Sequence, residues 1–276
     1  MKRVTSRENA DFKALAKLVS QVAERKKRAL SVLDGAHLLA AFLDSGRRAE
    51  RLAVNEAGLA DPEVRALLER AAPAPVTLLS DALFAALSTV DSPTGVIAAV
   101  PTPEGAPVPP DAGLVLALED IQDPGNVGTL LRSAAAAGAG HVLLSKRAAF
   151  AWSPKVLRAA MGAHFSLNIV EGADLAAFLA HYRGQSVALS ARAEATVYDL
   201  DLSGPVAFLV GNEGAGLGEE LQALATVRAR IPMPGRMESL NAATAGSLCL
   251  FEAVRQRAAR AVPPSTRGPL SRRKPQ

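Results

Sequence analysis

The chain has 276 residues, of which 49% are hydrophobic and 21% are charged, a balance typical of packed globular proteins. This length allows one large domain or two ordinary ones. The formal net charge of +4 and the sequence pI of about 9.5 are a mild basic excess, which by itself is weak evidence for a nucleic-acid partner.

The single cysteine and the N-terminus narrow the class of protein further. Cys249 is the only cysteine, so no disulfide can form within the chain, which fits a reducing compartment. We expect it to be a small buried hydrophobe. Residues 1–9 lack the apolar stretch of a signal peptide, and no uncharged apolar run is long enough to span a bilayer. The sequence therefore predicts a cytoplasmic protein with no membrane partner.

The first hundred residues alternate between helical and extended patterns. A helix is predicted over residues 8–28, because Leu15, Leu18, Val19 and Val22 recur at helical spacing. Short apolar stretches and helical ones follow in turn, at residues 29–33, 35–43, 52–54, 62–71, 76–79, 81–87 and 96–100. This alternation favours a small α/β sandwich.

A proline-rich segment is the clearest domain boundary. Prolines at positions 101, 103, 107, 109 and 110 prevent helix and sheet and favour an extended spacer. The final dozen residues are rich in Pro, Arg and Ser, a composition typical of disorder. The predicted organisation is an N-terminal domain at 1–100, a linker at 101–112, a larger C-terminal domain at 113–262 and a basic disordered tail at 263–276.

The C-terminal domain repeats the alternation with stronger apolar runs. Strands are predicted at 114–118, 141–144, 165–169, 186–189, 206–210 and 227–231. Helices are predicted at 126–137, 153–161, 173–181, 217–224 and, last, 241–260. Fully apolar strands between helices imply a parallel sheet covered on both faces. The predicted fold class is therefore α/β.

Three separated segments place small or amide residues where a strand meets a turn, the position at which open sheets bind ligands. In the first, Asp123 and Pro124 suit the cap and the first position of a helix. Capping does not require Asn126 and Gly128. Arg132 lies six residues after Asn126, about 120° round an ideal helix, so both can reach one ligand only if Asn126 lies in the entry turn. A well-capped helix with no further role is the alternative.

The second segment runs from a strand into a glycine-rich loop at residues 211–218. Its glycines let the backbone approach a ligand closely. The spacing is not that of a dinucleotide fingerprint, and the lysine of a P-loop is missing. Glu213 would also repel a phosphate, so the loop suits a ligand without phosphates. A flexible turn before a helix is the alternative.

The third segment closes a strand with residues 231–234 and enters the last helix near Ser239. Either Ser239 or Asn241 could simply cap that helix. With Glu238 there are three polar residues within one turn, which is more than a cap requires. The four histidines are scattered and no Cys/His cluster suggests zinc, so no metal site is predicted.

The three segments resemble the motifs of the SpoU (TrmH-type) RNA ribose methyltransferases, which belong to the knotted SPOUT superfamily. Residues 123–128 with Arg132 look like the first motif, and residues 210–214 look like the second. Residues 231–233 with 239–241 look like the third. Three motifs in order over the C-terminal domain are a specific match.

The resemblance carries implications for fold and assembly. Residues 4–13 and 34–37 resemble, more loosely, the family's substrate-binding domain, of the type seen in ribosomal protein L30e. The C-terminal domain would be a parallel sheet whose last segment threads a deep trefoil knot, which spacing alone could not show. The enzyme would be a homodimer, with RNA contacts that reach across subunits.

The implied reaction moves a methyl group from S-adenosylmethionine to a ribose 2′-hydroxyl of RNA. The implied catalytic residues are Asn126, Arg132, Glu213, Ser239 and Asn241. The implied cofactor contacts are Leu209, Gly211, Asn212, Ile231, Met233 and Leu240. In the family the arginine matching Arg132 is proposed to act on the hydroxyl. Because a guanidinium is a very poor base, the plainer hypothesis is that Arg132 binds phosphate and stabilises the developing alkoxide.

The basic run of Arg25, Lys26, Lys27 and Arg28 is the predicted RNA contact of the N-terminal domain, with a solvated helix end as the alternative. An appended L30e-like domain favours 23S ribosomal RNA over tRNA as the partner, by analogy. A non-catalytic RNA-binding protein on the same scaffold is the alternative to an enzyme, and it would need none of the five catalytic residues.

Overall fold

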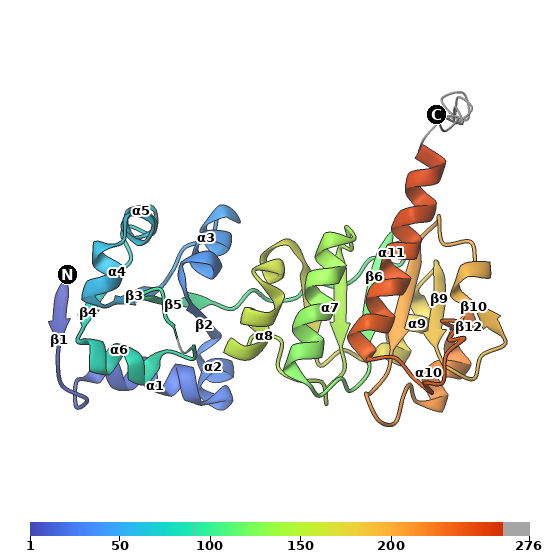
Figure 1. Ribbon diagram of the computed structural model, residues 1–276, viewed down its shortest axis with the longest axis horizontal. Coiled ribbons are helices and arrows are strands. Elements are labelled where there is room, and N and C mark those ends of the chain that lie inside the picture. The colour runs from blue at the N-terminus through green and yellow to red at the C-terminus, as the bar shows by residue number, and fades with distance from the viewer. Residues whose placement is uncertain (91, 262–276) are drawn as a thin grey trace, which may run out of the picture.

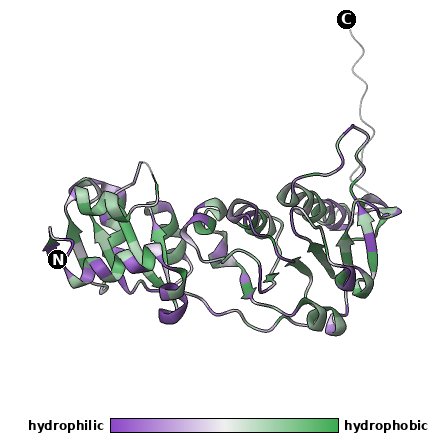
Figure 2. Ribbon diagram, turned by 90° about the horizontal axis from the view of Figure 1, so that it is seen from below, coloured by the Kyte–Doolittle hydropathy of each residue, from purple (hydrophilic) through white to green (hydrophobic). Residues whose placement is uncertain are grey.

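The computed structural model describes residues 1–90 and 92–261, which form two β-sheets covered by helices (Figure 1). The tail predicted at 263–276 lies outside the described residues. Strands of both sheets are mostly hydrophobic, whereas hydrophilic residues gather on outer helix turns and loops (Figure 2). Within the described part of the chain, no helix has the length and apolar character needed to cross a membrane.

The N-terminal sheet is mixed, with five strands in the order β1-β4-β3-β5-β2. Neighbours β1, β4 and β3 are parallel, whereas β5 is antiparallel to β3 and β2. Its strands are β1 (Lys2–Val4), β2 (Leu30–Asp34), β3 (Arg51–Val54), β4 (Val76–Leu79) and β5 (Val96–Pro101). Its helices are α1 (Ala10–Ser20), α2 (Val22–Arg28), α3 (Ala36–Asp44), α4 (Glu56–Ala60), α5 (Pro62–Arg70) and α6 (Asp81–Leu87). Residues that alternate along β2 pack on opposite faces, with Val32 toward α1 and α6 and Leu33 toward α3 and α5.

The C-terminal sheet is parallel throughout, with seven strands in the order β10-β12-β9-β11-β6-β7-β8. Its strands are β6 (Leu114–Leu118), β7 (His141–Leu144), β8 (Asn168–Glu171), β9 (Gln185–Leu189), β10 (Ala195–Thr196), β11 (Val206–Val210) and β12 (Val227–Arg230). Its helices are α7 (Pro124–Ala136), α8 (Pro154–Ala160), α9 (Leu175–His181), α10 (Glu219–Leu224) and α11 (Ala242–Ala261), with the short 3-10 turns η1 (Ala163–Ser166) and η2 (Val197–Asp199).

Both faces of this sheet are covered, which is why β6 and β11 are apolar at every position. In β6, Leu116 belongs to the cluster formed with α7, α8 and α11, and Val115 to the cluster formed with α9 and α10. All residues of β6 and β11 are buried. The prediction of an α/β fold with a parallel C-terminal sheet and a smaller N-terminal α/β unit is confirmed.

The two sheets share one continuous hydrophobic core, which runs from α3 into the C-terminal unit. The ring of Phe42 on α3 packs edge-on against Phe165, with centroids 5.3 Å apart. A Cβ added to Gly162 would lie 2.7 Å from the Cβ of Ala41, so the backbones approach closely here. The proline-rich segment is therefore not the only connection between the two units.

Pro101 ends β5, contrary to the expectation that this proline prevents sheet, whereas residues 102–110 contain no helix or strand. This segment is also fastened to the edge of the second sheet. The side chain of Asn168 bonds the backbone of Ala106 twice, accepting from its N at 2.8 Å and donating to its O at 2.9 Å. At Gly105, an added Cβ would lie 2.3 Å from the carbonyl oxygen of Ile169. The segment thus covers β8 as well as spanning two units.

Several elements differ from the expectation. The helix predicted at 8–28 breaks at Gln21, which is extended (φ −119°, ψ 114°), so α1 and α2 are separate. The strand predicted at 165–169 begins only at Asn168, because residues 163–166 form η1. The short strands β1 and β10 and the helix α4 were not anticipated by the hydrophobic pattern.

Candidate active site

The first two predicted segments lie side by side because β6 and β11 are parallel neighbours, with Leu118 opposite Val210. Their carboxyl ends therefore open at the same edge of the sheet. Asp123 caps α7, accepting a hydrogen bond from the backbone N of Asn126 at 2.8 Å. Asn126 is the third residue of α7 and so lies within the helix. The condition set for a ligand shared with Arg132, an Asn126 in the entry turn rather than in the regular helix, is therefore not met.

Residues from all three segments meet in one hydrogen-bonded chain. The Nδ2 of Asn241 donates to the Oδ1 of Asn126 at 2.9 Å, and the Nδ2 of Asn126 donates to the Oε1 of Glu213 at 3.0 Å. Asn241 also caps α11, because its Oδ1 accepts from the backbone N of Ala243 at 2.9 Å and of Thr244 at 3.2 Å. Capping and the bond to Asn126 use different atoms of the same amide.

The carboxylate of Glu213 is held in its ionised form. Partial burial acts to raise its pKa, but hydrogen bonds from Asn126 and from backbone amides outweigh this effect and lower the pKa. Those amides belong to Gln122, 3.2 Å from Oε2, and Asp123, 3.1 Å from Oε1. Glu213 therefore ties the glycine-rich loop to the entry turn of α7.

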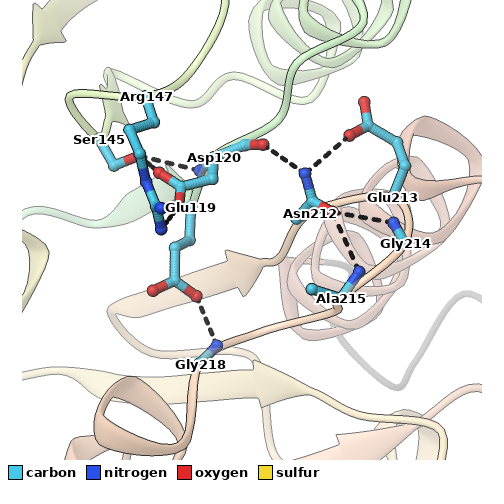
Figure 3. Close-up of polar contacts among 9 residues, drawn as sticks. All are labelled: Glu119, Asp120, Ser145, Arg147, Asn212, Glu213, Gly214, Ala215 and Gly218. Atoms are coloured by element: carbon cyan, nitrogen blue, oxygen red, sulfur yellow. Dashed lines mark hydrogen bonds and ion pairs between the residues drawn. The ribbon is translucent and has the colours of Figure 1, made fainter.

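The glycine-rich loop is internally braced. A Cβ on Gly211 would lie 2.1 Å from the backbone N of Leu217, so only glycine fits there. Asn212 donates from Nδ2 to the carbonyl of Asp120 at 2.8 Å, and its Oδ1 accepts from the backbone N of Gly214 and of Ala215 at 2.9 and 3.0 Å (Figure 3). The side chain of Asn212 is thus engaged within the protein, and the cofactor contact predicted for this residue stays a prediction that its backbone would have to fulfil.

The other predicted cofactor residues lie in β11, after β12 or just before α11. Leu209 is fully buried in β11. Strand β12 is parallel to β9, which in turn is parallel to β11, so Ile231 follows its strand at the edge where Gly211 follows β11. Ile231 and Met233 are half-buried, and Leu240, just before α11, is 38% exposed.

Two predicted catalytic residues stand outside the hydrogen-bonded chain. Arg132 lies on the exposed face of α7 together with Thr129, one turn earlier. Ser239 is exposed in the segment that precedes α11. Within residues 1–90 and 92–261, no hydrogen bond or ion pair from either side chain is formed. The structure thus joins Asn126, Glu213 and Asn241 but not these two.

The predicted RNA contact at residues 25–28 needs one correction. Arg25 is 3% exposed, and its Nη1 donates to the carbonyl oxygens of Leu18 and Val19 at 2.5 and 2.8 Å. Those carbonyls belong to the last turn of α1, so Arg25 joins α1 to α2 and faces away from solvent. Lys26 and Lys27 are exposed, and Arg28 is exposed but paired with Glu24.

Sequence reasoning gave no role to residues that the structure brings to this edge. Glu119 accepts a hydrogen bond through Oε2 from the backbone N of Gly218 at 2.6 Å. Asp120 contacts Ser145 and Arg147, which follow β7 (Figure 3). Their signal was positional, because each lies directly after a buried parallel strand.

A groove of about 440 Å³ lies between α7 and α11, beside the hydrogen-bonded chain. It is lined by Asn126 and Asn241 together with Thr129, Ala243, Thr244, Ser247, Leu248 and Phe251. A second groove, of about 350 Å³, lies between the proline-rich segment and α9, and none of the predicted site residues lines it. The first groove is therefore the one adjacent to the candidate chemistry.

Comparisons with known proteins agree with this geometry. Residues 113–251 match the SpoU rRNA Methylase family, and residues 9–98 match the MRM3-like substrate binding domain. The chain is 33% identical over 264 residues to an uncharacterized tRNA/rRNA methyltransferase of Synechocystis sp., covering 94% of this chain and 96% of that protein.

Two further relatives carry more specific names. The chain is 30% identical to the 23S rRNA (guanosine(2553)-2′-O)-methyltransferase RlmP of Bacillus subtilis, over 91% of this chain and 98% of that protein. A crystal structure of an AdoMet-bound rRNA methyltransferase from Sinorhizobium meliloti matches with a TM-score of 0.82 and 30% identity, covering 92% of this chain and 97% of the other. With its three motifs, its parallel sheet and these matches, the chain belongs to the SpoU rRNA methylase family.

Proposed function

We propose that this protein transfers a methyl group from S-adenosylmethionine to a ribose 2′-hydroxyl of 23S ribosomal RNA. The observation that carries the proposal is the hydrogen-bonded chain from Asn241 through Asn126 to Glu213, at the open edge of the sheet in a SpoU family member. The name of the Bacillus subtilis relative, a 23S rRNA 2′-O-methyltransferase, supports the choice of RNA. A protein with this substrate acts in the cytoplasm.

The residues present fit S-adenosylmethionine better than a phosphate-bearing cofactor. The ionised carboxylate of Glu213 disfavours phosphate. Because a side chain does not fit at Gly211, the loop begins with exposed backbone that a ligand can approach. When bound, the cofactor supplies a methyl group already activated by its sulfonium centre. We assign its contacts to the backbone around residues 209–212, 231–233 and 240.

The catalytic contribution of the chain is positioning and charge stabilisation. Asn126, fixed on both sides by Glu213 and Asn241, would orient the ribose. Arg132, exposed on the same helix, would bind a substrate phosphate and stabilise the alkoxide that develops on the 2′-oxygen. Ser239 would join the site from the segment before α11.

The proposal includes a homodimer and a trefoil knot formed by the segment that leads into α11. Leu248 and Phe251 are 40% and 47% exposed on α11 and line the groove beside Asn126. A second copy over this face would bury both side chains next to the site. Phe251→Asp is therefore expected to convert the dimer into a monomer, as measured by light scattering. A wild-type protein that is monomeric at micromolar concentration would contradict the dimer.

The function is tested by binding and by product mapping. Calorimetry should show that S-adenosylmethionine binds the protein without RNA. Transfer of a labelled methyl group to an unmodified 23S rRNA transcript, followed by mapping of 2′-O-methyl positions, should give one modified nucleotide. If the cofactor does not bind, the non-catalytic RNA-binding alternative holds. If tRNA alone is methylated, the proposed reaction is correct but the proposed RNA substrate is wrong.

A further inference from the structure

The loop that follows β7, residues 145–149, lies beside the proposed site but has no part in the reaction described above. Strand β7 is the parallel neighbour of β6, so this loop opens at the same sheet edge as the entry turn of α7. Both its ends are fastened there, with Ser145 N donating to Leu118 O at 3.0 Å and Ala149 N donating to Ile121 O at 2.8 Å. The loop is thus fixed against the site.

Asp120 holds this loop and the glycine-rich loop at once (Figure 3). The hydroxyl oxygen of Ser145 accepts from the backbone N of Asp120 at 2.9 Å and donates to its Oδ1 at 2.6 Å. The other carboxylate oxygen pairs with Nη2 of Arg147. The carbonyl oxygen of Asp120 accepts from Nδ2 of Asn212 at 2.8 Å.

The backbone of Asp120 is itself unusual, because its φ of 54° lies in the left-handed region that favours glycine. Such a conformation in another residue persists when the surroundings determine it, and it occurs often at functional sites. Here it directs the carboxylate of Asp120 toward Arg147 and its carbonyl oxygen toward Asn212. One residue therefore sets where both side chains lie.

Arg147 is anchored yet open to solvent. Its side chain is 81% exposed, whereas that of Asp120 is 14% exposed. An ion pair with so exposed a cation contributes little to folding. A guanidinium has five N–H donors, so the contact of Nη2 with Asp120 leaves others free to bind a phosphate in a fixed direction. The neighbouring Lys146 is also exposed.

The basic helix of the N-terminal unit lies against the end of the same loop. The Nζ of Lys26 is 5.0 Å from the ring centroid of Phe150, and the Cζ of the buried Arg25 is 5.8 Å from it. Lys27 is exposed on the same helix. Glu171 also faces this junction, where its carboxylate accepts from the backbone N of Ala151. Lys26 thus brings one exposed cation of the N-terminal unit next to the end of the loop that carries Arg147.

We propose that Arg147, oriented by Asp120, binds a backbone phosphate of the substrate RNA at the rim of the active site. Asp120 is a positioning residue, because it acts on the RNA only through Arg147 and on the glycine-rich loop through Asn212. The inference rests on the proposed function for the identity of the polymer. It adds a substrate contact on the side of the site that faces the N-terminal unit.

The test compares RNA binding with cofactor binding in matched variants. Binding of an unmodified 23S rRNA transcript is measured by filter retention at several KCl concentrations, and binding of S-adenosylmethionine by calorimetry. Arg147→Ala should weaken RNA binding about tenfold and reduce the slope of log affinity against log salt by about one. Its affinity for S-adenosylmethionine should stay at the wild-type value. Arg147→Lys should recover part of the RNA affinity, because the charge remains.

Two further variants separate positioning from folding. Asp120→Asn keeps a partner for Ser145 but removes the charge facing Arg147, so KM for RNA should rise several-fold with little change in kcat. Arg260→Ala is the matched control, because Arg260 is 69% exposed and paired with Asp201, 3.0 Å away, at the far end of α11. It should bind RNA as the wild type does.

The outcomes are distinct. Wild-type RNA affinity and salt slope in Arg147→Ala would overturn the inference, and so would an equal loss of affinity for S-adenosylmethionine, which would make the contact structural. An equal effect of Arg260→Ala would also overturn it, since any surface arginine would then serve. If the wild-type protein transfers no methyl group to the transcript, the proposed function fails, while the comparison of RNA binding still decides the role of Arg147.

Discussion

The two halves of the proposed site differ in how firmly the protein holds them. Residues 119–126 and 211–218 are joined by hydrogen bonds that Glu119, Asp120 and Glu213 accept. Residues 235–240 are all exposed, and within the described part of the chain no hydrogen bond reaches residues 232–240. The protein itself holds the first half together, and we expect a bound ligand to order the second.

This difference in hydrogen bonding suits the two halves of the site to different tasks. A pre-organised frame orients reacting groups without further cost at the moment of reaction. A segment with few partners can close over a ligand and open to release it. We therefore expect substitutions that break the hydrogen bonds of the braced half, residues 119–126 and 211–218, to act on catalysis and stability. We expect ligand binding to act chiefly on the open half, residues 232–240.

The largest effect is expected from Arg132→Ala, which removes the cation that we place on the developing alkoxide. Methyl transfer should fall by about a hundredfold to a thousandfold, the typical loss for one such group. Binding of S-adenosylmethionine and the melting temperature should not change, because Arg132 is exposed and has no partner among the described residues. Single-turnover rates above a tenth of the wild-type rate would remove Arg132 from the chemistry.

Gly211→Ala is the most direct test of whether the loop in the braced half is held rigidly. The new Cβ would lie 2.1 Å from the backbone N of Leu217, so we expect a loss of about 1–3 kcal/mol in the free energy of unfolding, and weaker cofactor binding. Gly214→Ala is the matched control, since its Cβ would lie 3.6 Å from the nearest atom, the Oδ1 of Asn212. Urea titration and calorimetry measure both. Equal effects of the two substitutions would show that the loop is not braced.

Glu213→Gln tests the charge within the braced half. Loss of the charged acceptor for Asn126 and two backbone amides should lower methyl transfer about tenfold. Because the folded-state pKa of Glu213 lies below its usual 4.5, its stabilisation is present above that value and disappears as the pH falls through the lowered one. The difference in melting temperature between wild type and variant should therefore be largest near neutral pH and vanish in acid. A difference that is constant with pH would contradict the assignment.

The smallest effect is expected in the open half. Ser239→Ala should change stability by less than about 0.5 kcal/mol, because the side chain is exposed. Hydrogen exchange in residues 232–240 should be fast without ligand and slow once S-adenosylmethionine is added, whereas residues 211–218 should change less. Protection of residues 232–240 before the cofactor is added would abolish the distinction between the halves.

The hydrophobic pattern predicted the bounds of several elements correctly. Strands β4, β6 and β11 and helix α6 lie at their expected positions, because each is a short apolar or amphipathic run between turn residues. The residues around Asn126 and Glu213 were assigned to one site because each segment follows an apolar strand and because the segments resemble the SpoU motifs. Only the structure shows that their strands are neighbours. Their mutual hydrogen bonds required coordinates, since sequence spacing does not orient amide groups.

Two predictions were wrong for reasons that the hydrophobic pattern of a segment does not show. Arg25 was placed with a solvent-facing basic run, but it accounts for two terminal carbonyls of α1 across the break at Gln21. Phe165 was placed in a strand, yet its ring packs on Phe42 from the other unit. The first contact joins residues six and seven positions apart across a helix break, and the second joins the two units. The hydrophobic pattern of the sequence carries no signal of either.

The continuous core between the two units has a consequence for how such enzymes can diversify. A unit attached only by a linker can be exchanged between relatives as a cassette that brings a new RNA preference. Here the ring of Phe42 packs on Phe165, and the close approach of Ala41 to the other unit requires a glycine at position 162. Transplanting the N-terminal unit alone would leave these surfaces mismatched, so a change of RNA target by recombination must carry residues 162–165 with it.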